Sequence, residues 1–265
     1  MRAKSLFTSL MTLMVFCLFV VPSYALDLGD VIGAWLFDEN GGTAVTDSSG
    51  NGLDGEVIGT TQWVVGKSGA ALDFAGADDN YVTIPHQDVM DLSEFTITAW
   101  VNLQDREAAR ASHWQVFMIK QGDDGQRNYS LMATSPAGQP YVGFSVAGTW
   151  PALTGASLVI DGAWHHVAGT YEEASGFKLY FDGVLDSEAG TQGPLPANTG
   201  AILIGNNTNF NRAAQGIIDE VGLFNKALTE DEIKMVMIEI PTGGPSAAQP
   251  AVKLTSTWGH VKTKY

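Results

Sequence analysis

The sequence predicts an all-β protein, an antiparallel two-sheet jelly-roll β sandwich with a short C-terminal helix. Strand-like runs recur along the chain between Gly, Asn, Asp and Pro, without the alternation of strands and helices that parallel βαβ units require. The run at 95–103 alternates apolar residues with Thr, Trp and Asn, which is typical of a strand with one buried face. Many such strands can bury their apolar faces as two sheets packed together.

The segment 164–184 gives the most detailed prediction. Two runs rich in β-branched and aromatic residues flank a short turn, and the second run ends in Asp182-Gly183, a dipeptide that tolerates the positive φ angles of a tight hairpin turn. Alternation places the odd residues from Phe177 to Phe181 on one face and the even residues on the other. We therefore expect a three-stranded meander with one buried face and one solvent-exposed face.

The other expected elements follow from the same patterns. The remaining strand-like runs span 31–37, 70–74, 81–84, 115–120, 129–133, 141–146, 201–204 and 217–224. The one predicted helix opens at Thr229, whose hydroxyl can cap the first turn while Glu232 reaches back to form a capping box. Ile233, Val236 and Met237 then form its apolar stripe.

Composition divides the chain into three parts. Residues 1–25 carry Arg2 and Lys4, an apolar stretch and a small-residue cleavage site, which is typical of a secretory signal peptide. Residues 26–240 are expected to form one domain, and residues 241–265 read as a Pro/Gly linker followed by a basic tail. The only cysteine, Cys17, lies in the signal segment, so the secreted chain should contain no disulfide. We expect a secreted protein without a membrane span.

The charge restricts the partners. The formal net charge is -15 at pH 7, and removal of the signal segment would make it more negative. Such a field repels nucleic acid and anionic lipid and favours cations or neutral ligands. A solvated acidic surface that keeps a secreted protein soluble explains the same charge.

Three segments resemble a known family. The central hairpin contains Trp-His-His-Val-Ala-Gly-Thr-Tyr at 164–171 and Leu-Tyr-Phe-Asp-Gly at 179–183. Trp-Leu-Phe-Asp-Glu lies at 35–39, and Gly-Ile-Ile-Asp-Glu-Val lies at 216–221. Over residues 30–238 the chain resembles the laminin-G-like (LamG) domains of the concanavalin A-like lectin and glucanase superfamily. The resemblance implies a sandwich that binds carbohydrates or extracellular proteins.

The same resemblance implies a metal site. Many laminin-G-like domains hold one calcium ion between the two ends of the chain, and the matching residues here are Asp38 and Asp219. The carbonyls of the turn at Gly42 and Thr43 could complete an oxygen shell, since calcium takes six to eight oxygen ligands. The alternative is that both aspartates only cap turns by accepting backbone N–H bonds.

Ligand binding needs aromatic platforms and polar groups on loops at one rim. The loop at 205–212 concentrates such groups, and Trp residues in or near other loops could add a platform. The candidate ligand-binding residues are Trp114, Trp150, Asn206, Asn207, Asn209 and Arg212. The same asparagines could instead serve tight turns, and the tryptophans could serve packing.

Catalysis is not expected. Glucanases of this superfamily carry a Glu-x-Asp-x-x-Glu arrangement on one strand, and that motif is absent. The nearest approximation is Asp186 with Glu188, which a solvated hairpin face explains. The sequence therefore favours a secreted, non-catalytic module that recognises carbohydrate or an extracellular protein, with one structural calcium. A glycan-cleaving enzyme and a structural or surface-assembly protein are the alternatives.

Overall fold

The computed structural model describes residues 26–105, 114–122, 126–145, 148–210, 212–240 and 242. The predicted signal peptide at 1–25 lies outside these residues, as does the predicted tail at 241–265 except for Thr242. Within the described ranges, no helix has the length and apolar character needed to cross a membrane.

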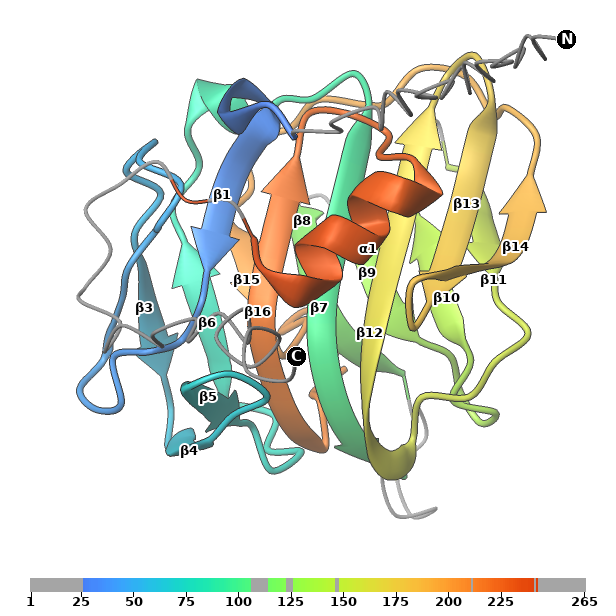
Figure 1. The fold of residues 1–265 in the computed structure, drawn as a ribbon. Helices are drawn as coiled ribbons and strands as arrows, with labels where there is room; N and C mark the ends of the chain where they lie inside the picture. The colour runs from blue at the N-terminus through green and yellow to red at the C-terminus, as the bar shows by residue number, and fades with distance from the viewer. Residues whose placement is uncertain are drawn as a thin grey trace, which may run out of the picture.

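Two antiparallel sheets of eight strands each form the body, which confirms the predicted all-β sandwich (Figure 1). Sheet A contains, in spatial order, β14 (Val184–Ala189), β13 (Gly176–Phe181), β12 (Asp161–Glu172), β7 (Phe95–Gln104), β16 (Gly216–Phe224), β5 (Ala70–Asp73) and β4 (Gln62–Val65), with β1 (Val31–Trp35) paired to β16. Sheet B contains β11 (Ala152–Thr154), β10 (Pro140–Gly143), β9 (Arg127–Ala133), β8 (Gln115–Gln121), β15 (Ile202–Ile204), β6 (Tyr81–Ile84), β3 (Gly55–Ile58) and β2 (Ala44–Val45). Two 3-10 turns, η1 (Leu28–Asp30) and η2 (Asp88–Met90), and the helix α1 (Glu230–Ile238) complete the described elements.

The apolar alternation of the strands fills the space between the sheets. Phe95, Ile97, Ala99, Val101 and Leu103 of β7 are all fully buried there, as the period-2 pattern predicts. The short strands β2, β3, β4 and β11 have no equivalent among the strands expected from the sequence. They are two to four residues long, which is too short to display a clear alternation.

Helix α1 crosses the outer face of sheet A (Figure 1). It begins after Thr229, whose side chain accepts from the Glu232 N–H while the Glu232 carboxylate accepts from the Thr229 N–H, so the predicted capping box is present. Ile233 and Val236 are buried against the sheet. Tyr180 of β13 packs in the same cluster and is only 3% exposed, so the face of the hairpin that was expected to be solvated is covered at this point.

The turn of the central hairpin has the predicted conformation, since Asp182 and Gly183 both have positive φ angles. The two neighbouring histidines of β12 face opposite ways. His166 is buried edge-on against the ring of Trp100. His165 lies at the rim, where Nδ1 is 2.9 Å from an oxygen of Asp182 and Nε2 is 3.2 Å from an oxygen of Asp161.

Candidate functional site

Two sites of potential function lie in different parts of the sandwich. The first is built on the turn between β4 and β5. The Oδ2 atom of Asp219 accepts hydrogen bonds from the backbone N–H groups of Lys67 (2.8 Å) and Ser68 (3.1 Å). The Oδ1 atom of Asp38 accepts from the Ala70 N–H at 3.1 Å. The two aspartates, 181 positions apart in the chain by their residue numbers, therefore both accept hydrogen bonds from the same turn.

Close approach of the Asp38 carboxylate depends on glycine in that turn. Gly69 has a φ angle of 54°, and a Cβ atom placed on it would collide with Oδ1 of Asp38. The sequence pattern Gly-Lys-Ser-Gly at 66–69 thus provides both the free N–H groups and the space for the carboxylates.

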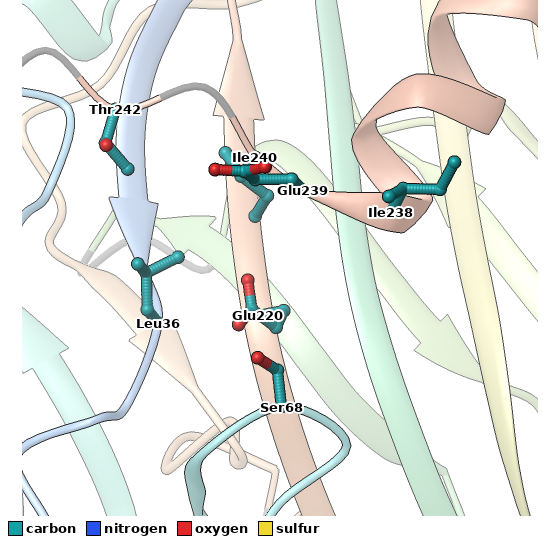
Figure 2. Close-up of a pocket in the computed structure, with 7 residues that line it drawn as sticks. All are labelled: Leu36, Ser68, Glu220, Ile238, Glu239, Ile240 and Thr242. Atoms are coloured by element: carbon teal, nitrogen blue, oxygen red, sulfur yellow. The ribbon is translucent and has the colours of Figure 1, made fainter. Parts of the chain in front are cut away.

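A β-bulge adds a third carboxylate to this site. The register between β16 and β7 shifts between Asp219 and Gly222, and Glu220 has a φ angle of 49°, which is unusual for a residue other than glycine. Its side chain points into a cavity of about 240 Å³ between the end of β1, the turn at Ser68 and the segment after α1 (Figure 2). We call Asp38, Asp219 and Glu220 the carboxylate cluster.

Two of the three carboxyl groups, Asp219 and Glu220, are harder to ionise than usual. Burial raises the pKa of Asp219 to about 7, against the three backbone N–H bonds that favour its charge, and Asp38 adds repulsion. Burial likewise raises the pKa of Glu220 to about 8, with further contributions from the charges of Asp219 and Asp38. A cation bound among these oxygens would remove that repulsion.

Each carbonyl that was predicted as a ligand accepts a hydrogen bond in this structure. The carbonyl of Gly42 accepts from the indole N–H of Trp63 at 2.9 Å, and the carbonyl of Thr43 accepts from the Val57 N–H at 2.7 Å. In the ranges that the structure describes, no three His, Cys, Asp or Glu side chains are already arranged as a coordination shell. The donor set of the carboxylate cluster suits a hard cation such as calcium, but its oxygens would have to converge on the ion.

The second site is a row of alternating arginine and aromatic side chains beside sheet B. The guanidinium carbon of Arg127 lies 4.6 Å from the ring centroid of Trp150 and 5.9 Å from that of Tyr141. Tyr141 meets the ring of Trp114 edge-on at 5.0 Å. The guanidinium carbon of Arg212 lies 5.2 Å from the centroid of Trp114 and 5.0 Å from that of Phe210. We call these six residues the arginine–aromatic cluster: Trp150, Arg127, Tyr141, Trp114, Arg212 and Phe210.

The arginine–aromatic cluster lies on the outer face of sheet B. Tyr141 and Trp114 pack with Val116 and Met132, whereas the next residues along the strands, such as Leu131 and Val142, belong to the core between the sheets. The two ends of the row are open to solvent, since Trp150 is 52% exposed and Phe210 is 49% exposed. Arg127, in contrast, is only 5% exposed.

The two arginines of this site lack a compensating acid among the residues that the structure describes. Burial lowers the pKa of Arg127, and the Tyr141 side chain partly offsets that effect. Burial also lowers the pKa of Arg212, and the charge of Arg127 lowers it further. The two guanidinium groups are therefore near enough to repel each other, in a protein with a net charge of -15.

Three hydrogen-bond donors at this site are buried without a partner among the residues that the structure describes: Nη1 of Arg127, Nε of Arg212 and Nε2 of Gln121. Gln121 is the β8 partner of Arg127 in the register of sheet B. Its Oε1 accepts from Nδ2 of Asn207 at 2.8 Å, and the carbonyl of Asn207 accepts from the Arg212 N–H at 3.4 Å. The three donors thus belong to neighbouring residues.

The predicted ligand-binding residues divide into two groups. Trp114, Trp150 and Arg212 are brought together in the arginine–aromatic cluster. Asn206 and Asn207 are buried and serve the loop: Nδ2 of Asn206 donates to the Asp78 carbonyl, and Oδ1 of Asn207 accepts from the N–H of Asn209.

Sequence reasoning missed Arg127, Tyr141 and Phe210. Phe210 lies within the candidate ligand-binding loop at 205–212, so its position in the sequence could have identified it as a further candidate. Nothing in the sequence near Arg127 or Tyr141 distinguishes these residues from ordinary strand residues. Only the tertiary structure brings the guanidinium group of Arg127 close to the ring of Tyr141.

The pair that came nearest to a glucanase motif has a structural role in part. Both oxygens of Asp186 accept from the loop between β11 and β12, with Oδ2 bound to the Ala156 N–H (2.6 Å) and Oδ1 to the Ser157 N–H (3.0 Å). Glu188 is exposed on β14. Asp186 thereby fastens a loop to the hairpin.

Two antiparallel sheets with a helix on the outer face define a jelly-roll sandwich of the concanavalin A-like class. The family model Laminin_G_3, of the Concanavalin A-like lectin/glucanases superfamily, matches residues 75–234. The chain therefore belongs to this laminin-G-like family. A comparison with curated proteins found no match.

Solved structures share the fold at low sequence identity. The binding domain of Paraclostridial Mosquitocidal Protein 1 has a TM-score of 0.65 at 16% identity, over 79% of this chain and 52% of that one. The binding domain of botulinum neurotoxin serotype G has a TM-score of 0.63 at 13% identity, over 78% and 51%. This chain thus spans about half the length of the toxin domains that it matches. Domain 4 of the extracellular arabinanase AbnA from Geobacillus stearothermophilus, solved with arabinotriose, has a TM-score of 0.62 at 19% identity, over 78% of this chain and 98% of that one.

Proposed function

We propose that this protein is a secreted, non-catalytic module that binds a carbohydrate through the arginine–aromatic cluster. The observation that carries the proposal is the row itself, with half-exposed aromatic rings at Trp150 and Phe210 and polar donors between them. Sugars stack their apolar faces on such rings and hydrogen-bond to the groups beside them.

The comparisons support this proposal at the level of the family. The arabinanase domain with the same fold was solved with a bound oligosaccharide, and the toxin domains are named as binding domains. The signal-peptide pattern at 1–25 supports secretion. The commitment of Asp186 to a loop supports a module without glycosidase activity, because that carboxylate is occupied by backbone donors.

Binding to an array of neutral and charged glycans tests the proposal. We expect Trp150→Ala and Phe210→Ala to weaken binding, since each removes an exposed stacking surface and neither is a core residue. Val65→Ala, which truncates an apolar side chain that is 85% exposed on sheet A, is the control and should leave binding unchanged. If no glycan binds, or if both aromatic variants bind like the wild type, the proposal is wrong. Binding only to an extracellular protein would favour the other ligand class that the family resemblance implies.

We further propose one structural calcium at the carboxylate cluster. The burial of Asp219 and Glu220 beside Asp38 supports it, because burial raises the pKa of Asp219 and Glu220 and a bound cation would stabilise their charged forms. In that position the carboxylates of Asp38 and Asp219 would join the two ends of the chain through one ion. Calorimetric titration of the chelated protein should show a heat of binding and a higher melting temperature. Absence of both effects would leave the aspartates as turn caps only.

A further inference from the structure

The polar groups of the arginine–aromatic cluster indicate which chemical class of glycan it binds. This inference rests on the proposed function, glycan binding at the same site. A neutral sugar satisfies donors and acceptors one hydroxyl at a time. Here three buried donors lack partners within the described part of the chain, and two of them belong to cations, Arg127 and Arg212. Burying a charged donor without an acceptor is costly, so the arrangement is completed best by a ligand that brings negative oxygens.

The geometry of the guanidinium groups favours a carboxylate as the anionic group of the ligand. Arg127 lies over the ring of Trp150, and Arg212 lies over the rings of Trp114 and Phe210. The contacts with the rings engage the charge of each guanidinium group, and its N–H groups remain the hydrogen-bond donors. A carboxylate is planar and matches such an edge with two parallel N–H···O bonds. The rings beside it can hold the apolar face of a sugar.

The charges around the arginine–aromatic cluster favour an acidic ligand at this site, although the protein as a whole is acidic. Twenty-nine acidic residues stand against 14 basic ones, so the protein as a whole repels anions. In the described ranges no ion pair joins Arg127 or Arg212 to an acidic residue, and the charge of Arg127 lowers the pKa of Arg212. Two cations without an ion-pair partner among the described residues form a local site for one acidic group.

We propose that the arginine–aromatic cluster binds an acidic glycan, with the carboxylate of a uronate or sialate unit on Arg127 and Arg212 and the sugar ring stacked on Trp150 or Phe210.

Calorimetric titration of the full chain with matched oligosaccharides tests this. The probes are oligogalacturonate, oligoguluronate and sialyllactose, each with its methyl ester, together with neutral oligosaccharides and a sulfated heparin fragment. We expect at least one carboxylated probe to bind, and its methyl ester to bind at least about tenfold more weakly, because esterification removes the charge from the hydrogen bonds.

Variants assign the effect to the site. Arg212→Gln should weaken binding of the carboxylated probe at least about tenfold. Lys178→Gln removes the same charge from sheet A and should leave the affinity unchanged. Arg127 is almost completely buried, so Arg127→Gln is included only if its thermal unfolding matches the wild type.

The outcomes separate this inference from the proposed function. Equal affinity for a carboxylated probe and its ester, or binding of neutral sugars that depends on Trp150 but not on Arg212, would overturn the acidic ligand and leave glycan binding intact. Binding of the sulfated fragment alone would overturn the proposal that the acidic group of the ligand is a carboxylate. Failure of every glycan to bind would overturn both proposals.

Discussion

Raising the pH in the presence of a chelator should destabilise the native protein, and the effect should depend on Asp219. The pKa of this carboxyl is about 7 in the folded protein, against an ordinary value of 3.8. Between these values the folded state keeps a proton that the unfolded chain has released. The free energy of unfolding therefore falls as the pH rises through this window, which is the reverse of the behaviour of a carboxylate in a salt bridge.

The size of the effect follows from the same two values. A carboxyl that titrates near pH 4 in the unfolded chain and near pH 7 in the folded protein contributes about 3 kcal/mol to the difference in stability between about pH 5 and pH 8.5, as an upper limit. Glu220 acts in the same direction, but it is partly exposed and solvent screens its contribution. We therefore expect a total loss of about 3 to 4 kcal/mol.

Urea unfolding at the two pH values, with EDTA present, measures this loss. Asp219→Asn cannot ionise, and its amide oxygen can still accept from Lys67 and Ser68. The variant loses the bond to the Glu220 N–H and should be less stable at about pH 5, but it should lose less stability than the wild type up to about pH 8.5, because only the contribution of Glu220 remains. The difference in pH dependence between the two proteins is the informative quantity. Identical pH dependence, or a wild type that gains stability as the pH rises, would refute the reasoning.

Calcium provides a second test of the same carboxylates. If the ion binds the deprotonated cluster, it should restore the stability of the wild type at about pH 8.5 and have little effect on Asp219→Asn. An equal effect of calcium on both proteins would place the ion elsewhere.

Three further predictions concern other parts of the fold. Thr229→Ala removes the capping box of α1 and should cost about 1 kcal/mol in urea unfolding, whereas Thr208→Ala in an exposed turn should cost much less. Burial alone would lower the pKa of His165, but its hydrogen bonds to two aspartates outweigh burial and raise the pKa above 6.5. The stabilisation of the folded protein by protonated His165 should therefore be complete below pH 6.5 and lost as the pH rises through the raised pKa. An NMR titration of the wild type and of His165→Gln can follow this change. Gly205 has a φ angle of 85° and faces the ring of Phe74, so Gly205→Ala should destabilise the protein by about 2 kcal/mol or more, and a melting temperature equal to the wild type would contradict this.

Local patterns in the sequence were sufficient for many of the elements. The alternation in β7 predicted its buried face, Thr229 and Glu232 predicted the start of α1, and Asp182-Gly183 predicted the turn of the hairpin. Each of these features depends on residues within a few positions of one another, so backbone geometry and side-chain period decide them. The family resemblance added Asp38 and Asp219 as a pair, and both accept hydrogen bonds from the same turn between β4 and β5.

The tertiary structure determined which residues from distant parts of the chain become neighbours. Tyr180 was expected in solvent because alternation reports only the two faces of a strand, and it does not report a helix that later covers one of them. The bulge that turns Glu220 into the cavity appears only in the pairing of β16 with β7. Packing across sheet B joins Trp114, Trp150 and Arg212 through Arg127 and Tyr141.

The sequence by itself thus determined the class of fold, the capped helix and the hairpin, because short-range periodicity and turn chemistry specify them. The arginine–aromatic cluster and the carboxylate cluster exist only because sheet pairing brings distant segments together. Their chemistry also depends on burial, which raises the pKa of Asp219 and leaves donors of Arg127 and Arg212 without partners. Burial is a property of the packed structure and cannot be read from neighbouring residues in the chain.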